Sequence, residues 1–270
     1  MKSNLAMPAL LPHHAASVAA FLNKTRSDDS IVAVLLGGSL VKGTYRRDSD
    51  VDLMIVLTAD AFADRQAHSK LAECLYDGIT YEKGYYDVKY VTREILELTA
   101  VRGSEPARNA FVGARVVQSS DSCMADLVAS ISCYPEHERS EKIAAFHAGL
   151  VFSTGYFWSE ARKRGDSYLL MRSATDAVMY GLRMVLGYNR ILFPCQRWLT
   201  KAVGDCAETP PNILALAETL LTTLGDDERT AFREAILQWR DWEITGDVQS
   251  RYVRDHELWW QWNGPFVNEW

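Results

Sequence analysis

Two aspartates are placed where their side chains could bind a metal ion. Asp50 immediately precedes the β-prone run Val51–Leu57, and Asp52 is the second residue of that run. Residues two apart on a strand point to the same face, so the two carboxylates are expected side by side. Adjacent carboxylates repel unless a cation lies between them, and hard oxygen ligands in this arrangement suit Mg²⁺, which also binds phosphate oxygens. The pair therefore predicts a magnesium site that handles phosphates.

A phosphate-binding turn is expected just before these acids. Gly37, Gly38 and Ser39 end an earlier β-prone run, and ten residues separate Ser39 from the first aspartate. A short helix starting there would offer free backbone N–H groups and the Ser39 hydroxyl to an anion. Glycine lets the backbone approach the anion closely. Lys42 either neutralises a triphosphate or lies in a solvated loop, and Ser49 either binds phosphate or closes the turn before the acids.

A third acid is expected near the pair, as a further metal ligand or as a general base. Asp87 is the best candidate, because it lies inside the β-prone run 85–92, where burial is costly without a metal or hydrogen-bond partner. Glu82 and Asp77 are weaker candidates in turn-like surroundings. Lys89 is two residues from Asp87, on the same strand face, where it would pair with that acid or reach a nucleotide.

The elements that position these residues suggest two domains, residues 1–121 and 122–270. The first mixes helix and strand, with β segments expected at 31–36, 51–57, 79–82, 85–92 and 114–117 and helices at 13–26, 60–77, 93–101 and 106–113. The second is expected to be entirely helical, with helices at 123–132, 139–164, 167–188, 195–204, 210–224, 227–244 and 248–262. The predicted fold class is α+β: an α/β domain with a mixed sheet, followed by an all-helical bundle domain.

Composition narrows the functional classes. The 270-residue chain has 29 Lys and Arg against 35 Asp and Glu, a net charge of −6, which argues against a general nucleic-acid binder. Nucleic-acid partners are therefore not expected. We find no apolar run long enough to span a membrane. The five cysteines are scattered without a CxxC pair, which favours a reducing, cytoplasmic location over a disulfide framework.

The pattern Gly38-Ser39, ten residues, then Asp50-Val51-Asp52-Leu53 resembles the signature of DNA polymerase beta-like nucleotidyltransferases. The Asp-Ser-Asp-Val-Asp-Leu string and the appended helical domain are most similar to the small-molecule branch, which includes aminoglycoside and lincosamide nucleotidyltransferases, and to related uncharacterised bacterial proteins. The resemblance implies that Gly38 and Ser39 contact nucleotide phosphates. It also implies that Asp50 and Asp52 bind Mg²⁺ and that Asp87 fills the third acidic position, as a metal ligand or only as a base.

The resulting hypothesis is a Mg²⁺-dependent enzyme that transfers a nucleoside monophosphate, AMP from ATP in the leading version, to a hydroxyl of a small molecule. The expected partners are a nucleoside triphosphate and that acceptor, with a homodimer left open. Acidic residues in the helical half would suit a cationic acceptor such as an aminoglycoside, although solvated helix faces explain them equally well. These acids are Asp226, Asp227, Glu228, Glu234, Asp241 and Glu243.

Two alternatives stay open. A nucleotidyltransferase-like domain can serve as a regulatory or antitoxin protein that binds or adenylylates a protein partner. Separately, Arg251 and His256 resemble the Arg–His element of HEPN-type ribonucleases, a spacing that also occurs often by chance. The tryptophans late in the chain, among them Trp239, Trp242 and Trp262, are mainly a packing signal, with a minority exposed as a stacking wall.

Overall fold

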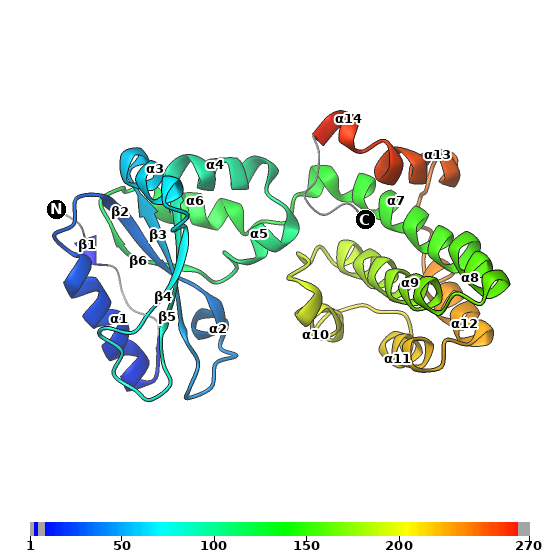
Figure 1. The fold of residues 1–270 in the computed structure, drawn as a ribbon, viewed down its shortest axis with the longest axis horizontal. Coiled ribbons are helices and arrows are strands. Elements are labelled where there is room, and N and C mark those ends of the chain that lie inside the picture. Colours follow the sequence, from blue (N-terminus) through cyan, green and yellow to red (C-terminus); the bar gives the residue numbers. More distant parts are fainter. Residues whose placement is uncertain (1–2, 5–8, 264–270) are drawn as a thin grey trace. The chain divides into compact units, whose positions relative to one another are not determined.

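The computed structural model describes residues 3–4 and 9–263, and the chain divides into two compact units, Met1–Cys133 and Tyr134–Trp270. Figure 1 traces their elements. The boundary lies after Cys133 rather than after residue 121, because the helix Met124–Ile131 packs on the sheet of the first unit. Trp262, whose stacking role we considered above, has a side chain outside the described residues. Within the described residues no helix is both long and apolar enough to cross a lipid bilayer.

The first unit is an α/β domain whose elements alternate along the chain. They are β1 Ser3–Asn4, α1 Pro12–Thr25, β2 Ile31–Leu36, α2 Gly38–Lys42, β3 Val51–Leu57, α3 Ala59–Ala67, β4 Ala72–Leu75, β5 Tyr86–Thr92, α4 Arg93–Arg102, α5 Glu105–Asn109, β6 Arg115–Ser119 and α6 Met124–Ile131. The strands form one sheet in the order β1-β6-β2-β3-β5-β4. Among the strands that the structure describes, only the β3–β5 pair is parallel, so the sheet is mixed, as predicted.

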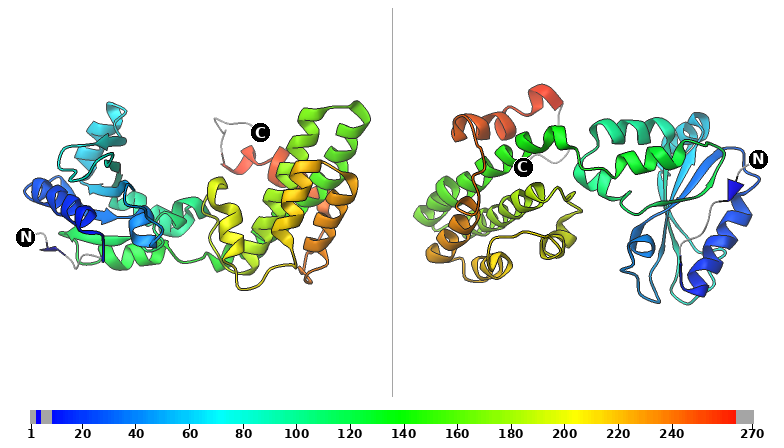
Figure 2. Two further views of the ribbon diagram at one scale, coloured as in Figure 1. Left: turned by 90° about the horizontal axis from the view of Figure 1, so that it is seen from below. Right: turned by 180° about the vertical axis from the view of Figure 1, so that it is seen from behind.

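Two hydrophobic layers cover the two faces of this sheet. Because side chains alternate along a strand, Val34 and Leu36 of β2 pack with α1, whereas Ala33 and Leu35 pack with α4 and α6. Figure 2 shows α1 on one face and α4 with α6 on the other. β2 and β3 are continuous apolar runs because these central strands are covered on both faces of the sheet.

Two predictions between residues 60 and 82 were wrong. The helix expected over 60–77 ends at Ala67, and Ala72–Leu75 instead forms β4, which pairs with β5. The β segment expected at 79–82 is a turn region, where Tyr81 donates a hydrogen bond to the Ser49 carbonyl oxygen (2.5 Å). Contacts with residues far away in the sequence determine the structure of both segments, so local composition predicted it wrongly.

The second unit is helical, as predicted. Its elements are a 3₁₀ turn at Glu136–Glu138, α7 Arg139–Phe152, a π-helical turn at Ser153–Phe157, α8 Trp158–Arg164, α9 Ser167–Tyr188, a 3₁₀ turn at Gln196–Trp198, α10 Leu199–Gly204, α11 Ile213–Thr223, α12 Asp226–Leu237, α13 Val248–Tyr252, a π-helical turn at Val253–Glu257 and α14 Trp260–Asn263. Helix α9 runs through its core, with 11 of its 22 residues buried. Trp158 is buried, and Trp239 and Trp242 pack against this core, whereas Trp260 is exposed.

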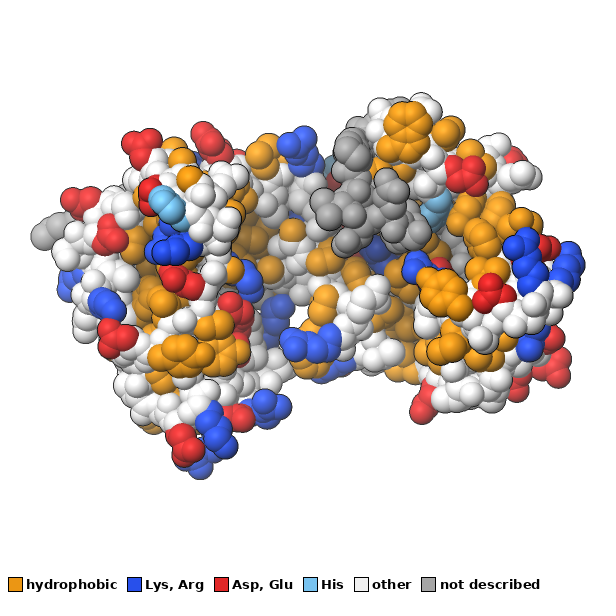
Figure 3. All heavy atoms as spheres, viewed as in Figure 1, with side chains coloured by type: hydrophobic (Ala, Val, Ile, Leu, Met, Phe, Trp, Pro, Cys, Tyr) orange, Lys and Arg blue, Asp and Glu red, His pale blue; other side chains and the backbone are white. Residues whose placement is uncertain are grey.

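Charged side chains of both signs are interspersed over each unit on the face that Figure 3 shows. Several charged side chains of the described chain form ion pairs within one helix, such as Lys201 with Asp205 and Arg172 with Asp176. Exposed pairs of this kind contribute little to stability. This face therefore carries mixed charge rather than a single-sign field.

Candidate active site

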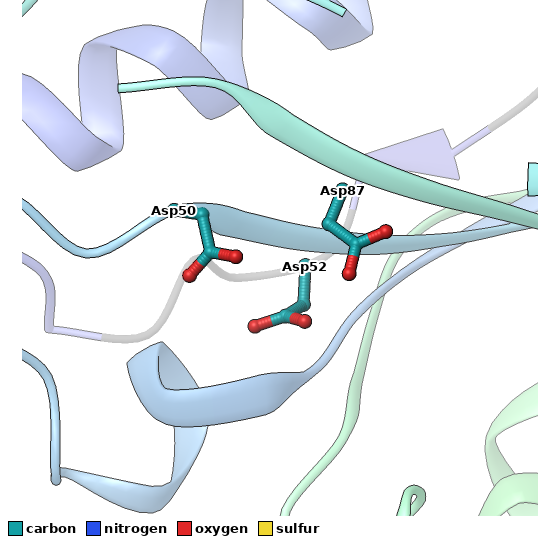
Figure 4. A group of neighbouring side chains, drawn as sticks. All are labelled: Asp50, Asp52 and Asp87. Atoms are coloured by element: carbon teal, nitrogen blue, oxygen red, sulfur yellow. The ribbon is translucent and has the colours of Figure 1, made fainter. Parts of the chain in front are cut away.

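Three of the predicted acids meet at one end of the sheet. Asp50, Asp52 and Asp87 each offer a carboxylate oxygen, and these oxygens all lie within 4.8 Å of one another. Asp52 and Asp87 are register partners on the parallel strands β3 and β5. Figure 4 shows the three carboxylates converging on one side of this strand pair. We call these residues the aspartate triad. Each is partly buried.

The triad carries concentrated negative charge. Burial, followed by the neighbouring charges of Asp50 and Asp87, raises the pKa of Asp52 to about 6 from an ordinary value of 3.8. A hydrogen bond from the Ser39 backbone N–H and the positive charge of Lys89 act in the opposite direction. Carboxylates held together in this way fit a divalent cation, which removes the repulsion and binds hard oxygen ligands.

The glycine-serine turn packs directly against the triad. Gly37 and Gly38 lie at the start of α2, and the Gly37 N–H donates to the Asp52 carbonyl oxygen (3.0 Å). Gly38 has φ +65°, and an ideally placed Cβ on it would lie 1.7 Å from Asp52 Oδ2. Only glycine fits here, both for its backbone conformation and for the space that a side chain would take from the carboxylate.

Ser39 leaves a buried hydroxyl without a hydrogen-bond partner beside this turn. A buried polar atom normally has a hydrogen-bond partner, which can be a water molecule or a bound group. A phosphate oxygen meets this need. The triad and the orphaned hydroxyl together fit a magnesium-bound nucleotide phosphate, as predicted from the sequence, although the individual binding roles stay predictions.

Three other predicted residues are engaged with the protein itself. The Lys42 ammonium donates to the carbonyl oxygen and Oδ1 of Asn109 (3.2 and 3.1 Å). Ser49 Oγ accepts from the Arg46 N–H (2.8 Å), so Ser49 closes the turn, as in the second of its two interpretations. Asp77 pairs with Lys24 instead of joining the triad.

Several residues that hold the triad were not predicted. The Tyr85 hydroxyl donates a hydrogen bond to the Asp50 carboxylate, and this bond is the main cause that raises the pKa of Tyr85 to about 12. Tyr81 bonds to the carbonyl oxygen of Ser49, immediately before Asp50. The only signal in the sequence was the high tyrosine content of residues 81–86, which also reads as ordinary strand composition.

Two histidines at the start of α1 support the same loop. His13 Nε2 lies 2.9 Å from the Arg47 carbonyl oxygen, and the fully buried His14 packs against both His13 and Tyr81. Burial, together with the charge of His13, lowers the pKa of His14. Both histidines lie in the first turn of α1, which agrees with the prediction that they start a helix.

Comparison with known protein families identifies this arrangement. Residues 18–109, which contain the turn and all three acids, match the family model described as the nucleotidyltransferase domain. Residues 18–109 are therefore similar to nucleotidyltransferase domains. The predicted superfamily is thereby confirmed at the level of this domain, whereas the aminoglycoside and lincosamide branch stays a prediction.

The chain is also similar to a solved structure. This is the crystal structure of a nucleotidyltransferase-like protein from Exiguobacterium sibiricum. The two chains are 11% identical, the alignment covers 95% of this chain and 83% of the other, and the TM-score is 0.49. No curated protein matches this chain.

Proposed function

We propose that this protein is a Mg²⁺-dependent nucleotidyltransferase that moves a nucleoside monophosphate, AMP from ATP in the leading version, onto a hydroxyl of a small molecule. One observation carries the proposal: three convergent carboxylates lie against a glycine-serine turn with an orphaned hydroxyl, inside a nucleotidyltransferase domain. The reaction needs positioning and charge stabilisation rather than a covalent intermediate on the protein.

Each residue has a role in this scheme. Asp50 and Asp52 would hold Mg²⁺, which supplies charge neutralisation to the triphosphate. The Ser39 hydroxyl and the adjoining turn hold the phosphates. The acceptor oxygen forms a bond to the α-phosphorus, the bond from that phosphorus to the bridging oxygen breaks, and pyrophosphate leaves. Asp87, on the neighbouring strand and beside the same two acids, would either add a third ligand to Mg²⁺ or take the proton of the acceptor hydroxyl.

We assign acceptor binding to the helical unit, which contains a cavity of about 580 Å³, a size that suits a small molecule. Asp241, Glu243 and Asp247 line it, together with Trp242. Arg139, Arg251 and Arg254 also line the cavity, and Arg251 and Arg254 each form ion pairs with Glu141 and Asp255. Acidic and aromatic walls support a polyhydroxylated, amine-bearing acceptor such as an aminoglycoside.

The other acids that suggested a cationic acceptor have a simpler explanation. Asp226, Asp227 and Glu228 form the first turn of α12, where negative charge stabilises the helix dipole. Asp226 also accepts a hydrogen bond from Trp158 Nε1 (2.6 Å). The case for an aminoglycoside therefore depends on the cavity-lining acids and not on the charge of the whole unit.

The ion pairs of Arg251 also weigh against the ribonuclease alternative. Its guanidinium is bound to two carboxylates, and His256 is stacked on Tyr252, with ring centroids 4.3 Å apart. Burial is the largest of several influences on His256 and lowers the pKa of its imidazole. Packing and ion pairing account for both residues without a catalytic role.

The decisive experiment incubates the purified protein with Mg²⁺, α-labelled ATP and panels of aminoglycosides, lincosamides and host proteins. We expect labelled product and equimolar pyrophosphate with at least one small-molecule acceptor, and neither with EDTA or with Asp52→Asn. Label on a protein alone would favour the adenylylating, regulatory alternative. No product, no pyrophosphate and no nucleotide binding would refute the transferase proposal.

A further inference from the structure

A lysine lies directly beside the aspartate triad. Lys89 follows Asp87 by two residues on β5, so both side chains are on the same face of the strand. Its Nζ lies 3.3 Å from Asp87 Oδ2. The side chains of Lys89 and Asp87 are 55% and 31% exposed, so the pair is in contact with water. An exposed pair of this kind is held weakly.

The charge of Lys89 acts on more of the triad than its direct partner. Three carboxylates within 4.8 Å bring a formal charge of −3 to one small volume, and Lys89 also opposes the upward pKa shift of Asp52. A cation in this position relieves the repulsion between the acids. Lys89 Nζ contacts Asp87 Oδ2, an oxygen of one of the three carboxylates that could hold a metal ion.

We propose that Lys89 is a built-in counter-ion that neutralises the third carboxylate of the metal-free triad and gives way when Mg²⁺ binds. The inference rests on the proposed function in one respect, namely that the triad binds the metal. Lys89 acts through Asp87 and is thus a positioning residue. Because its pair with Asp87 is exposed and weak, a divalent ion displaces it readily.

This role has two consequences of opposite sign. Without metal, Lys89 stabilises the fold by offsetting the repulsion of the three acids. With metal, the same positive charge opposes Mg²⁺ and competes for Asp87. A lysine with a merely structural role would stabilise the protein in both states and would not weaken metal binding.

The test compares Lys89→Met with the wild-type protein in two measurements that need no acceptor. Isothermal titration with Mg²⁺ alone should show binding about three- to tenfold tighter in the variant, because a nearby repulsive charge is gone. Thermal unfolding should show a lower melting temperature than wild type in EDTA and no deficit in saturating Mg²⁺. Lys89→Arg keeps the charge and should resemble wild type in both measurements.

Lys24→Met is the matched control. Lys24 also pairs with an exposed aspartate, but it lies on α1, which covers the other face of the sheet. The control changes the net charge equally and should leave Mg²⁺ affinity unchanged. In the Asp87→Asn background, Lys89→Met should lose most of its effect on affinity, because the contested carboxylate is absent.

Unchanged or weaker Mg²⁺ binding by Lys89→Met, with wild type binding normally, overturns this inference and leaves the proposed function intact. If Lys89→Met does not fold even in Mg²⁺, Lys89→Gln is titrated in its place and judged by the same criterion. A wild-type protein that binds no Mg²⁺, with or without ATP, overturns both the inference and the proposed function.

Discussion

Replacing Asp52 by asparagine should make the metal-free protein more stable at neutral pH. The pKa of Asp52 in the folded protein is about 6, raised from 3.8 chiefly by burial. Folding therefore favours the protonated form. The stability that the protonated Asp52 contributes is fully present below pH 3.8, and it is lost as the pH rises through 6 and the folded protein has to hold the charged form. Asparagine has the shape of the protonated acid and carries no charge at any of these pH values.

The magnitude follows from the size of the shift. About two pKa units correspond to about 3 kcal/mol, at about 1.36 kcal/mol for each unit. Partial exposure of Asp52 screens the charge, so the free energy recovered should be about 1–2 kcal/mol. The side-chain amide oxygen that Asp52→Asn introduces would still accept the hydrogen bond from the Ser39 N–H, so little is lost in exchange.

The assay is thermal or urea unfolding in EDTA at about pH 4 and about pH 8, on either side of the folded-state pKa. We expect Asp52→Asn and wild type to be equally stable at the lower pH and the variant to be more stable at the higher pH. Saturating Mg²⁺ should reverse the order at the higher pH, because only wild type keeps both metal-binding acids. The exposed Asp29→Asn serves as a control. No gain at the higher pH, or an equal gain at both, would refute the reasoning.

Three further substitutions test the walls of the site. Gly38→Ala should lower the free energy of unfolding by more than about 1 kcal/mol, on the order of the cost of a strained backbone position, and should weaken binding of an ATP analogue. Gly37→Ala is its control and should be tolerated in unfolding assays, because the added Cβ would lie 3.9 Å from its nearest neighbour. Ser39→Ala should leave the melting temperature nearly unchanged and weaken ATP-analogue binding about five- to tenfold by calorimetry, because its hydroxyl has no partner within the protein; a large fall in stability would contradict this. Tyr85→Phe removes the hydrogen bond to the first acid of the triad and should weaken Mg²⁺ binding a few-fold by titration, with equal affinity counting against a positioning role.

Two of the three acids could be predicted from the sequence because each breaks a local rule. Asp52 and Asp87 are charges inside β-prone runs, and such exceptions mark functional positions. The strands that carry them were also predictable, since continuous apolar runs need no distant partner to be recognised. Asp50 followed from its spacing alone.

The supports of the triad could not be predicted, because they act across long sequence separations. His13 reaches the loop at Arg47, and Tyr81 reaches Ser49 from beyond β4. None of these residues is unusual in its own segment. The same reason applies to Ala72–Leu75, which is a strand only because β5 lies beside it.

The pairing of Asp52 with Asp87 also bears on the order of folding. These partners lie on parallel strands separated in the chain by a helix and another strand, so their contact is non-local and forms only after a long loop has closed. We therefore expect the complete metal site to form late, near the native state. Mg²⁺ should then slow unfolding of the first unit while leaving its folding rate almost unchanged, which stopped-flow measurements with and without the ion would show.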